Sequence, residues 1–372
     1  MSAASGPSAI VVGAGIVGAA CAEALAEAGC RVTVFEAGLA GSGATATSMG
    51  HLVVMDGSEA EFALSAYSRR LWTERAETLP ASCEDSPSGT LWLAADEDEM
   101  ALVHGKAAFY TARGEAVEVL DAAALHEAEP QLRPTLVGAL RVQADRIIYP
   151  PAATWLFLDR ARARGATVHE GVIVEAVRPR GARVAGTWNE ADVLVVAAAA
   201  ASTRLLPGLP IEPRKGHLVI TDRYPGFLRH QVVELGYLKE AHTMSRESVA
   251  FNVQPRSTGQ LLIGSSRELV GWDSSINAAL RDRMLRRAEE YVPAISTLSA
   301  LRTWVGFRPA TPDGLPLVGE WEPGLLVAAG HEGLGVTTSL GTARMVADLA
   351  LGRPSALDPK PFDPRRSKAP HA

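Results

Sequence analysis

Residues 9–18 read AIVVGAGIVG, an apolar run that leads directly into three glycines spaced as Gly-x-Gly-x-x-Gly. The apolar run predicts a buried strand, and the alanine-rich stretch behind the glycines predicts a helix that ends near Gly29. A second strand is predicted at 31–36. A strand, a glycine-rich turn, a helix and a strand within about 30 residues make a βαβ unit, so this end of the chain predicts an α/β fold.

The three glycines of this turn fit a dinucleotide. Gly13 permits the tight turn, Gly15 lets the backbone approach a pyrophosphate, and Gly18 opens a helix whose N–H groups attract that anion. Glu36 ends the second strand, where its carboxylate can accept hydrogen bonds from an adenosine ribose and would repel a 2′-phosphate, which disfavours NADP. Because 34 of the 372 residues are glycine, the spacing alone is a weak signal, and the alternative is a βαβ turn that binds no ligand.

The far end of the chain favours FAD over NAD. Residues 327–336 read VAAGHEGLGV, another predicted strand that runs into a glycine-rich turn, and a helix rich in small residues follows at 337–351. A second helix N-terminus aimed at the cofactor suits a flavin ring, because it stabilises the negative charge that builds up at N1 and C2=O on reduction. The loop at 37–50 is rich in Gly, Ser, Thr and Ala, so its backbone can lie close against a cofactor.

Composition excludes several other classes of protein. The chain has 36 basic and 42 acidic residues, a balance that disfavours a nucleic-acid partner. Its cysteines (Cys21, Cys30 and Cys83) are too few to hold an iron–sulfur cluster and lack zinc-ligand spacing, so we expect no metal and a reducing, cytoplasmic location. The first basic residue is Arg31, which disfavours a signal peptide, and the apolar run at 193–201 is far shorter than the ~20 residues that span a bilayer.

These segments resemble the D-amino-acid oxidase superfamily of FAD enzymes, which includes glycine oxidase, sarcosine oxidase and D-amino-acid dehydrogenases. The resemblance covers nearly the whole chain and rests on the N-terminal glycines with Glu36 and on the segments 41–52, 193–202, 306–309 (GFRP), 313–319 (DGLPLVG) and 330–337.

Two further segments resemble one branch of that superfamily most. Residues 48–56 (SMGHLVVMD) and 251–256 (FNVQPR) are similar to the catalytic β subunit of D-hydroxyproline dehydrogenase and to related opine and hydrogen-cyanide-forming dehydrogenases. The chain departs from the superfamily at two points. Some sarcosine oxidases attach their flavin through a late cysteine, and no cysteine follows Cys83, so the resemblance implies non-covalent FAD. Ala199 stands where many relatives carry glycine.

The resemblance implies a Rossmann-type FAD-binding domain that is interrupted by an α+β substrate domain with a mixed sheet. The FAD-binding domain is expected at 1–85, 145–212 and 303–352, the substrate domain at 86–144 and 213–302, and a solvated, disordered tail at 353–372. Periodicity predicts helices at 58–78, 96–110, 151–164 and 278–291, and strands at 89–94, 136–142, 167–177, 191–201 and 260–264.

Arg308 is the first candidate for the substrate site, because a guanidinium can clamp an amino-acid carboxylate with two parallel hydrogen bonds. The resemblance implies this role for the Arg of the GFRP segment, and the alternative is an Arg that pairs with a structural carboxylate. His51 is expected near the flavin ring or the substrate amine, or else as a packing residue. Tyr237 is expected over the substrate, with core packing as the alternative.

Four other polar residues are not assigned a catalytic role. His331, like His51, is expected near the flavin ring or the substrate amine, or else to shape the turn before Gly333. Lys215 with His217 is expected to form a surface or hinge feature rather than a catalytic one. Arg256 remains open between a partner-facing and a structural role. The resemblance further implies that FAD is held by Gly13, Gly15, Ile16, Val17, Gly18, Glu36, Ala37, Ala44, Thr45, Ser48, Met49, Gly50, His51, Val174, Ala198, Gly330, Gly333, Leu334, Gly335, Val336 and Thr337.

The function implied is an FAD-dependent dehydrogenase of a small D-amino or imino acid, with cis-4-hydroxy-D-proline as the best candidate. Hydride would pass from the substrate Cα to flavin N5, and electrons would continue to a partner subunit that carries an iron–sulfur cluster. One alternative is an oxidase of the glycine or sarcosine type that passes electrons to oxygen. An alternative of another class is a subunit that holds FAD and assembles a complex while another chain performs the oxidation.

Overall fold

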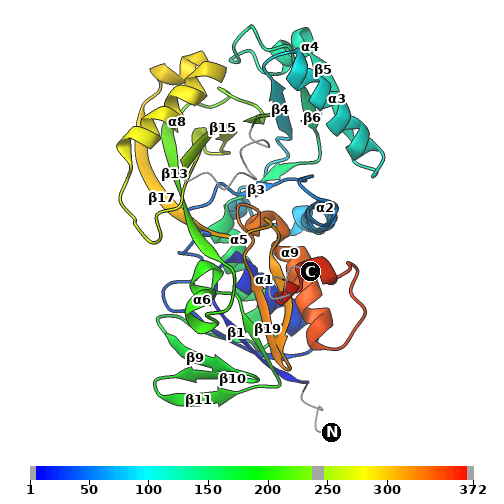
Figure 1. Ribbon diagram of the computed structural model, residues 1–372, viewed down its shortest axis with the longest axis vertical. Coiled ribbons are helices and arrows are strands. Elements are labelled where there is room, and N and C mark those ends of the chain that lie inside the picture. The colour runs from blue at the N-terminus through cyan, green and yellow to red at the C-terminus, as the bar shows by residue number, and fades with distance from the viewer. Residues whose placement is uncertain (1–5, 237–246, 367–372) are drawn as a thin grey trace, which may run out of the picture.

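The computed structural model describes residues 6–236 and 247–366. Two large sheets lie one above the other along the long axis of the molecule (Figure 1). The lower sheet has six strands in the order β18-β19-β12-β1-β2-β8, and the upper has eight in the order β17-β13-β16-β15-β14-β4-β6-β5. The chain passes between them several times, so the predicted mixed α/β architecture, in which one sheet-containing unit interrupts the other, is confirmed.

The lower sheet grows from the predicted βαβ unit. Its strands are β1 (Ser8–Val12), β2 (Arg31–Phe35), β8 (Thr167–His169), β12 (Val193–Val196), β18 (Leu317–Glu322) and β19 (Leu325–Ala329), and only β18 runs antiparallel to its neighbour. Alternate residues of β1 enter two different cores. Ala9 and Val11 pack with α1 (Ile16–Glu27), α5 (Pro150–Arg162) and α9 (Gly335–Ala350), which cover one face of the sheet.

The other face of the lower sheet is covered mainly by a small antiparallel sheet. Ile10 and Val12 share a buried cluster with residues of β9 (Val174–Arg178) and β10 (Gly181–Val184), and β11 (Thr187–Glu190) completes that sheet. Because both faces are buried, β1 reads as a continuous apolar run rather than as an alternating pattern.

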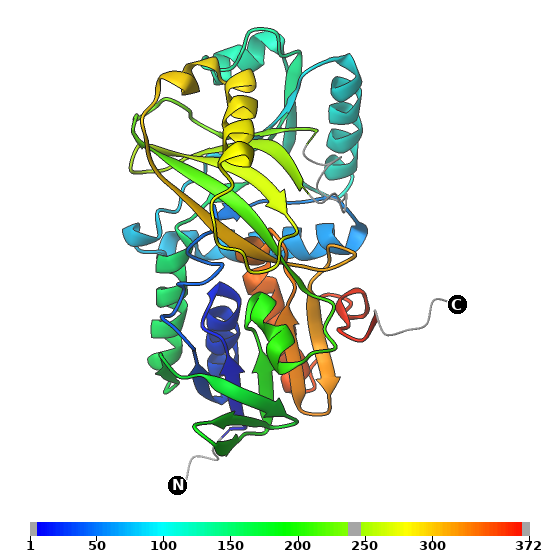
Figure 2. The ribbon, with the colours of Figure 1, turned by 60° about the vertical axis from the view of Figure 1, so that its left-hand side comes forward.

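The upper sheet is mixed, as predicted. It contains β4 (Thr90–Ala94), β5 (Val117–Asp121), β6 (Gly138–Val142), β13 (Glu212–Arg223), β14 (Gln231–Glu234), β15 (Glu247–Pro255), β16 (Gln260–Glu268) and β17 (Ala300–Ala310), all antiparallel to their neighbours except for the β14–β4 pair. α8 (Ala278–Tyr291) lies against β15 and β16 (Figure 2), and α3 (Glu97–Thr111) and α4 (Ala122–Ala128) flank β5 and β6.

Between the sheets run α2 (Glu59–Arg75), which packs on α9, and the short pair β3 (His51–Leu52) and β7 (Arg146–Ile147). The remaining short elements are α6 (Ser202–Leu205) and 3-10 turns at Ala76–Thr78, Ala81–Cys83, Ala199–Ala201, Pro293–Thr297 and Lys360–Phe362. None of the helices in the described ranges is long and apolar enough to cross a membrane.

Two of the predicted strands need correction. The single strand predicted at 167–177 is two strands, β8 and β9, in different sheets, because the chain turns at Gly171 with φ 70°. The strand predicted at 191–201 ends at Val196, and Ala199 then adopts φ 50° in a 3-10 turn. Glycine adopts this left-handed conformation more easily than alanine does.

The predicted domain boundary at 303 falls inside β17, which pairs with β13 from Ala300 to Ala310 and so belongs to the upper sheet. The expected disorder of the tail is wrong for residues 353–366. Phe362 is 1% exposed in the core around α1, and Arg366 pairs with Asp313 at 2.7 Å. A buried aromatic and an ion pair anchor this segment despite its polar composition.

Candidate functional site

The glycine-rich turn has two glycines that the fold requires. Gly13 has φ 105°, and a Cβ there would lie 2.6 Å from the carbonyl oxygen of Ala197. A Cβ on Gly18 would lie 2.0 Å from the carbonyl oxygen of Gly13, so the helix can pack this closely only without a side chain.

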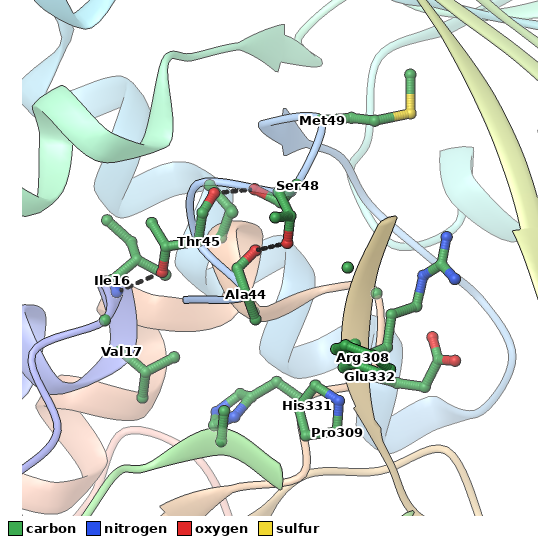
Figure 3. Close-up of a pocket in the computed structure, with 18 of the residues that line it drawn as sticks. Ile16, Val17, Ala44, Thr45, Ser48, Met49, Arg308, Pro309, His331 and Glu332 are labelled. Carbon is green, nitrogen blue, oxygen red and sulfur yellow. Dashed lines mark hydrogen bonds between the residues drawn. The ribbon is translucent and has the colours of Figure 1, made fainter. Parts of the chain in front are cut away.

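Gly15 differs from these two, because the protein around it leaves room for a side chain. Its φ of −71° suits any residue, and a Cβ would meet only the Thr45 hydroxyl, at 3.2 Å. The same hydroxyl accepts a hydrogen bond from the Ile16 N–H at 3.0 Å (Figure 3). The bare backbone of Gly15 therefore faces a cavity rather than another part of the chain.

Glu36 is tied to the same turn. Its carboxylate accepts hydrogen bonds from the Ala14 N–H at 2.7 Å and from the Gly38 N–H at 2.8 Å. These bonds hold the carboxylate at the carboxyl end of β2, beside the first glycines. Its contact with a ribose remains a prediction.

The cavity contains about 1070 Å³ of space outside the protein atoms and runs from the N-terminus of α1 towards the upper sheet. Twelve of the predicted cofactor-binding residues line it: Gly15, Ile16, Val17, Ala44, Thr45, Ser48, Met49, Gly50, His51, Gly333, Gly335 and Val336. Segments far apart in sequence thus meet at one wall, and the N-termini of α1 and α9 both open onto it.

The other predicted cofactor-binding residues do not line this cavity: Gly13, Gly18, Glu36, Ala37, Val174, Ala198, Gly330, Leu334 and Thr337. Several of them shape its wall from behind. Gly330, with φ 75°, allows the turn before α9, and the Thr337 hydroxyl donates to the carbonyl oxygen of His51 at 2.8 Å. Ala197 and Ala199 line the wall on either side of Ala198.

Arg308 enters the cavity from β17. Its Nη1 donates to the carbonyl oxygen of Ser266 at 3.0 Å, and its side chain lies beside that of Glu332 (Figure 3). Burial alone would raise the pKa of Glu332, but Arg308, Arg267 and Arg214 together hold it below its ordinary value. Glu332 is therefore ionised at neutral pH, and Arg214 pairs with it at 3.4 Å.

A second chamber adjoins the first and shares His51, Asn252, Glu332 and Gly333 with it. Its other wall residues include Trp92, Leu334 and the two arginines Arg214 and Arg267. The sequence interpretation missed Asn252, Glu332 and both arginines. Strand alternation in β13 is a signal that points to Arg214, because it places residues 214, 216 and 218 on one face.

His51 is part of the wall of both chambers. Its Nε2 lies 3.4 Å from the amide nitrogen of Asn252. Burial lowers the pKa of His51 to about 4, although a hydrogen bond with Gln231 opposes the shift. The imidazole is therefore neutral at pH 7, so His51 offers a hydrogen-bonding group rather than a charge.

His331 is also neutral and is held in the wall of the first chamber. Its Nε2 lies 3.0 Å from the Thr342 hydroxyl, and burial lowers its pKa to about 3. The hydrogen bond joins the turn before α9 to the helix itself, in agreement with a turn-shaping role.

Protonation of His331 is expected to destabilise the fold in acid. The unfolded chain takes up a proton at this residue near pH 6.5, whereas the folded chain does so only near pH 3, so stability falls as the pH drops below 6.5. When the pH is lowered from 7.5 to 5, the free energy of unfolding of the wild type falls. We expect it to fall by about 2 kcal/mol less in His331→Gln. Urea unfolding at the two pH values measures this difference. The exposed His104→Gln serves as the control, and an equal loss in His331→Gln and wild type would contradict the expectation.

Lys215 and His217 are not surface residues, which corrects that part of the sequence prediction. They are 1% and 0% exposed and lie on the face of β13 opposite the cavity. The Lys215 ammonium pairs with Glu268 and Asp273, each at 3.2 Å. A buried ammonium is stable there because two carboxylates neutralise it.

The structure also answers the question left open for Arg256. Its guanidinium pairs with Glu84 at 2.9 Å and contacts the carbonyl oxygens of Met49 and Ile148 at 3.5 and 3.4 Å. It is a structural residue that fixes the loop before β3. Tyr237 lies outside the described residues.

Within the described ranges, neither the cysteines nor the side chains of types that can bind a metal form a second site. Cys21, Cys30 and Cys83 are buried and unpaired with one another. Within residues 6–236 and 247–366, no group of three or more His, Cys, Asp or Glu side chains has the arrangement of a metal site.

Comparison with known proteins gives a consistent result. A family model described as "DAO: FAD dependent oxidoreductase" matches residues 8–349. The glycine oxidase of Geobacillus kaustophilus strain HTA426 is 30% identical over 375 residues, which is 95% of either chain. A crystal structure of glycine oxidase from Geobacillus kaustophilus is similar to the structure of this chain, with a TM-score of 0.86 and 29% sequence identity. The match covers 97% of this chain and 99% of the other. A D-amino acid dehydrogenase of Xanthobacter autotrophicus strain Py2 is 29% identical over 80% of this chain and 71% of its own length.

Proposed function

We propose that this chain, which belongs to the DAO family of FAD-dependent oxidoreductases, is a dehydrogenase of a small D-amino or imino acid, with cis-4-hydroxy-D-proline as the first candidate. The chain is an FAD-dependent amino acid oxidoreductase that acts on a CH–NH group. The observation that carries the proposal is Arg308, which projects into the cavity that the predicted cofactor residues line.

The residues of the cavity fit FAD. Gly13 and Gly18 have no room for a Cβ, and Gly15 presents bare backbone to the cavity at the N-terminus of α1. Two buried polar atoms of the wall, Asn252 Oδ1 and Ser265 Oγ, have no hydrogen-bond partner within the described part of the chain. Such atoms are stabilised when a ligand supplies the missing partner.

The positions of these residues predict which part of FAD each group would hold. The turn at Gly13–Gly18 and Glu36 would hold the adenosine and pyrophosphate, and the loop at 44–51 with the N-terminus of α9 would hold the isoalloxazine ring. When bound, FAD supplies the hydride acceptor, N5, for the hydrogen on the substrate Cα.

The chain itself binds and orients the substrate. The Arg308 guanidinium clamps the carboxylate, which fixes the face of the Cα that meets the cofactor. His51 is neutral and Glu332 is ionised, so the wall offers acceptors to the substrate N–H groups. No residue is required to remove a proton from the Cα, because hydride leaves with its electron pair.

The choice of hydroxyproline rests on the two segments that resemble that branch. They meet in the wall of the cavity, where His51 of the first lies 3.4 Å from Asn252 of the second. The same resemblance is the basis for proposing a partner subunit with an iron–sulfur cluster as the acceptor, and the three buried cysteines of this chain are too few to hold such a cluster themselves. Free, buried cysteines also favour the cytoplasm as the proposed location.

An oxidase of the glycine type is the second candidate. It is favoured by one observation: the glycine oxidase of Geobacillus kaustophilus is 30% identical to this chain, and the match covers 95% of each sequence. Transfer of electrons to oxygen needs no partner subunit. The two candidates therefore differ in substrate and in acceptor.

An anaerobic titration tests the proposal. The purified yellow protein is mixed with cis-4-hydroxy-D-proline, its L epimer, D-proline, glycine and sarcosine, and the visible absorbance of the flavin is followed. We expect bleaching by the D-imino acids, slow recovery in air and fast recovery with a dye acceptor. Bleaching by glycine or sarcosine with fast recovery in air would support the oxidase. No bleaching by any of the five compounds would contradict the substrate assignment.

A further inference from the structure

Arg308 reaches across a whole strand. It belongs to β17, and its Nη1 donates to the carbonyl oxygen of Ser266 on β16, at 3.0 Å. The sheet order is β17-β13-β16, so β13 lies between the two partners. Adjacent strands are about 4.8 Å apart, which means that the guanidinium must pass directly over the backbone of β13.

The residue of β13 under the guanidinium is Gly216. Register pairs Gly216 with Gly306 and Arg214 with Arg308, so Arg308 leans by two residues along the strand to lie over Gly216. A Cβ on Gly216 would lie 2.3 Å from Nη1 and 2.9 Å from Cζ of Arg308, and 2.8 Å from the carbonyl oxygen of Ser266. Each distance is below a normal van der Waals contact, so a methyl group and the present guanidinium cannot occupy this space together.

The φ angle of Gly216 does not itself require glycine. It lies outside the left-handed range that side chains avoid, and Gly216 sits inside a regular stretch of the β13–β17 ladder. Glycine in a strand interior marks either a bulge or a close approach by another group. Both occur here: the β13–β16 register shifts between Lys215 and Val219, and the Arg308 side chain and the Ser266 carbonyl oxygen both approach the position of the missing Cβ.

The acceptor of Arg308 is fixed from the far side of the sheet. The Ser266 hydroxyl accepts a hydrogen bond from the His217 N–H at 2.9 Å and lies 2.8 Å from His217 Nδ1. His217 Nε2 in turn accepts from the Asn277 N–H at 3.0 Å. Since His217 and Ser266 are 0% and 1% exposed, Ser266 presents its carbonyl oxygen at a fixed point.

We propose that Gly216 is a positioning residue, whose missing side chain lets the Arg308 guanidinium lie across β13 and reach its place in the cavity. The proposal rests on the proposed function of Arg308 as the clamp for the substrate carboxylate. With alanine at 216, the guanidinium must move off the strand, and the clamp loses its position while the cofactor wall at Gly15 and the loop 44–51 stays unchanged.

The test is a double-mutant cycle between Gly216→Ala and Arg308→Met. Gly216→Ala alone is expected to raise the substrate KM by about tenfold or more, with FAD retained and kcat lowered less than KM is raised. In the Arg308→Met background, Gly216→Ala is expected to change KM far less than in the wild-type background, because the Arg308 atoms at 2.3 and 2.9 Å are gone and only the Ser266 carbonyl oxygen, at 2.8 Å, still crowds the new methyl group. Gly105→Ala, on the exposed surface of α3 with open space around it, controls for the exchange itself.

The outcomes separate the proposal from the function on which it rests. Pyrrole-2-carboxylate is a planar proline analogue that cannot be oxidised. If Arg308→Met leaves the substrate KM and the Kd of this compound unchanged, Arg308 does not bind the carboxylate, and Gly216 has no carboxylate-binding group to position. If Arg308→Met raises KM but Gly216→Ala does not, the positioning role alone is wrong. The positioning role would also be overturned if Gly216→Ala had the same effect on KM in both backgrounds. The same conclusion would follow if it caused an equal loss of FAD or an equal fall in melting temperature in both, because the glycine would then be needed for the backbone itself.

Discussion

Arg308→Met is expected to raise the substrate KM by roughly 100- to 1000-fold while the protein remains yellow. Methionine has a similar length but no positive charge and no hydrogen-bond donors, so the variant loses the bidentate contact to the carboxylate. Glu332 keeps Arg214 and Arg267 as neighbouring cations, so its charge stays compensated and the wall of the cavity should persist. FAD binding depends on other residues, at the N-termini of α1 and α9.

The measurement combines steady-state kinetics with binding of pyrrole-2-carboxylate, followed by the visible absorbance of the flavin. This planar compound has the carboxylate and ring nitrogen of a proline analogue but no hydrogen on a tetrahedral Cα, so it cannot be oxidised. Arg70→Met is the matched control, because Arg70 is an exposed residue of α2 whose side chain is 67% accessible. Unchanged affinity in Arg308→Met would favour the remaining alternative, a subunit that holds FAD while another chain binds the substrate.

Gly15→Val is expected to lower the affinity for FAD by at least about 100-fold without unfolding the protein. The backbone at Gly15 suits any residue, and a Cβ there meets only the Thr45 hydroxyl, at 3.2 Å. The valine side chain would therefore stand in the cavity at the N-terminus of α1. It would keep a pyrophosphate away from the N–H groups of the helix, whose attraction for an anion acts only at short range.

The affinity is measured by titrating FAD into the deflavinated protein and following the quenching of flavin fluorescence. The melting temperature of the same apoprotein reports on the fold, and Gly105→Val on α3 controls for the introduction of valine at an open glycine. Normal FAD affinity in Gly15→Val would place the pyrophosphate elsewhere. A large fall in the melting temperature of the apoprotein would show instead that Gly15 serves the fold.

Several parts of the fold could be predicted from the sequence, because the residues that signal them are close together in the chain. The glycines at 13 and 18 mark a turn that needs backbone without side chains, and the helices at α2, α3 and α8 follow the apolar spacing and the N-caps Ser58, Asp96 and Asn277. Strand boundaries were less predictable: 167–177 reads as one β-rich run, yet its two halves pair with different sheets.

The βαβ unit, the glycine turn at each end of the chain, the family and the candidate Arg308 could all be predicted, because each depends on residues that are neighbours in sequence or on a short motif. The side chains that surround Arg308 could not be predicted in this way, because they come together only in the folded chain. Arg214 and Glu332 are 118 residues apart, and the position of Arg308 over Gly216 depends on the register of β13 with β17. Tertiary structure also decided that Lys215 and His217 are buried and that the tail packs as far as Arg366. Burial and register depend on what lies across the sheet, and residues distant in sequence supply those neighbours.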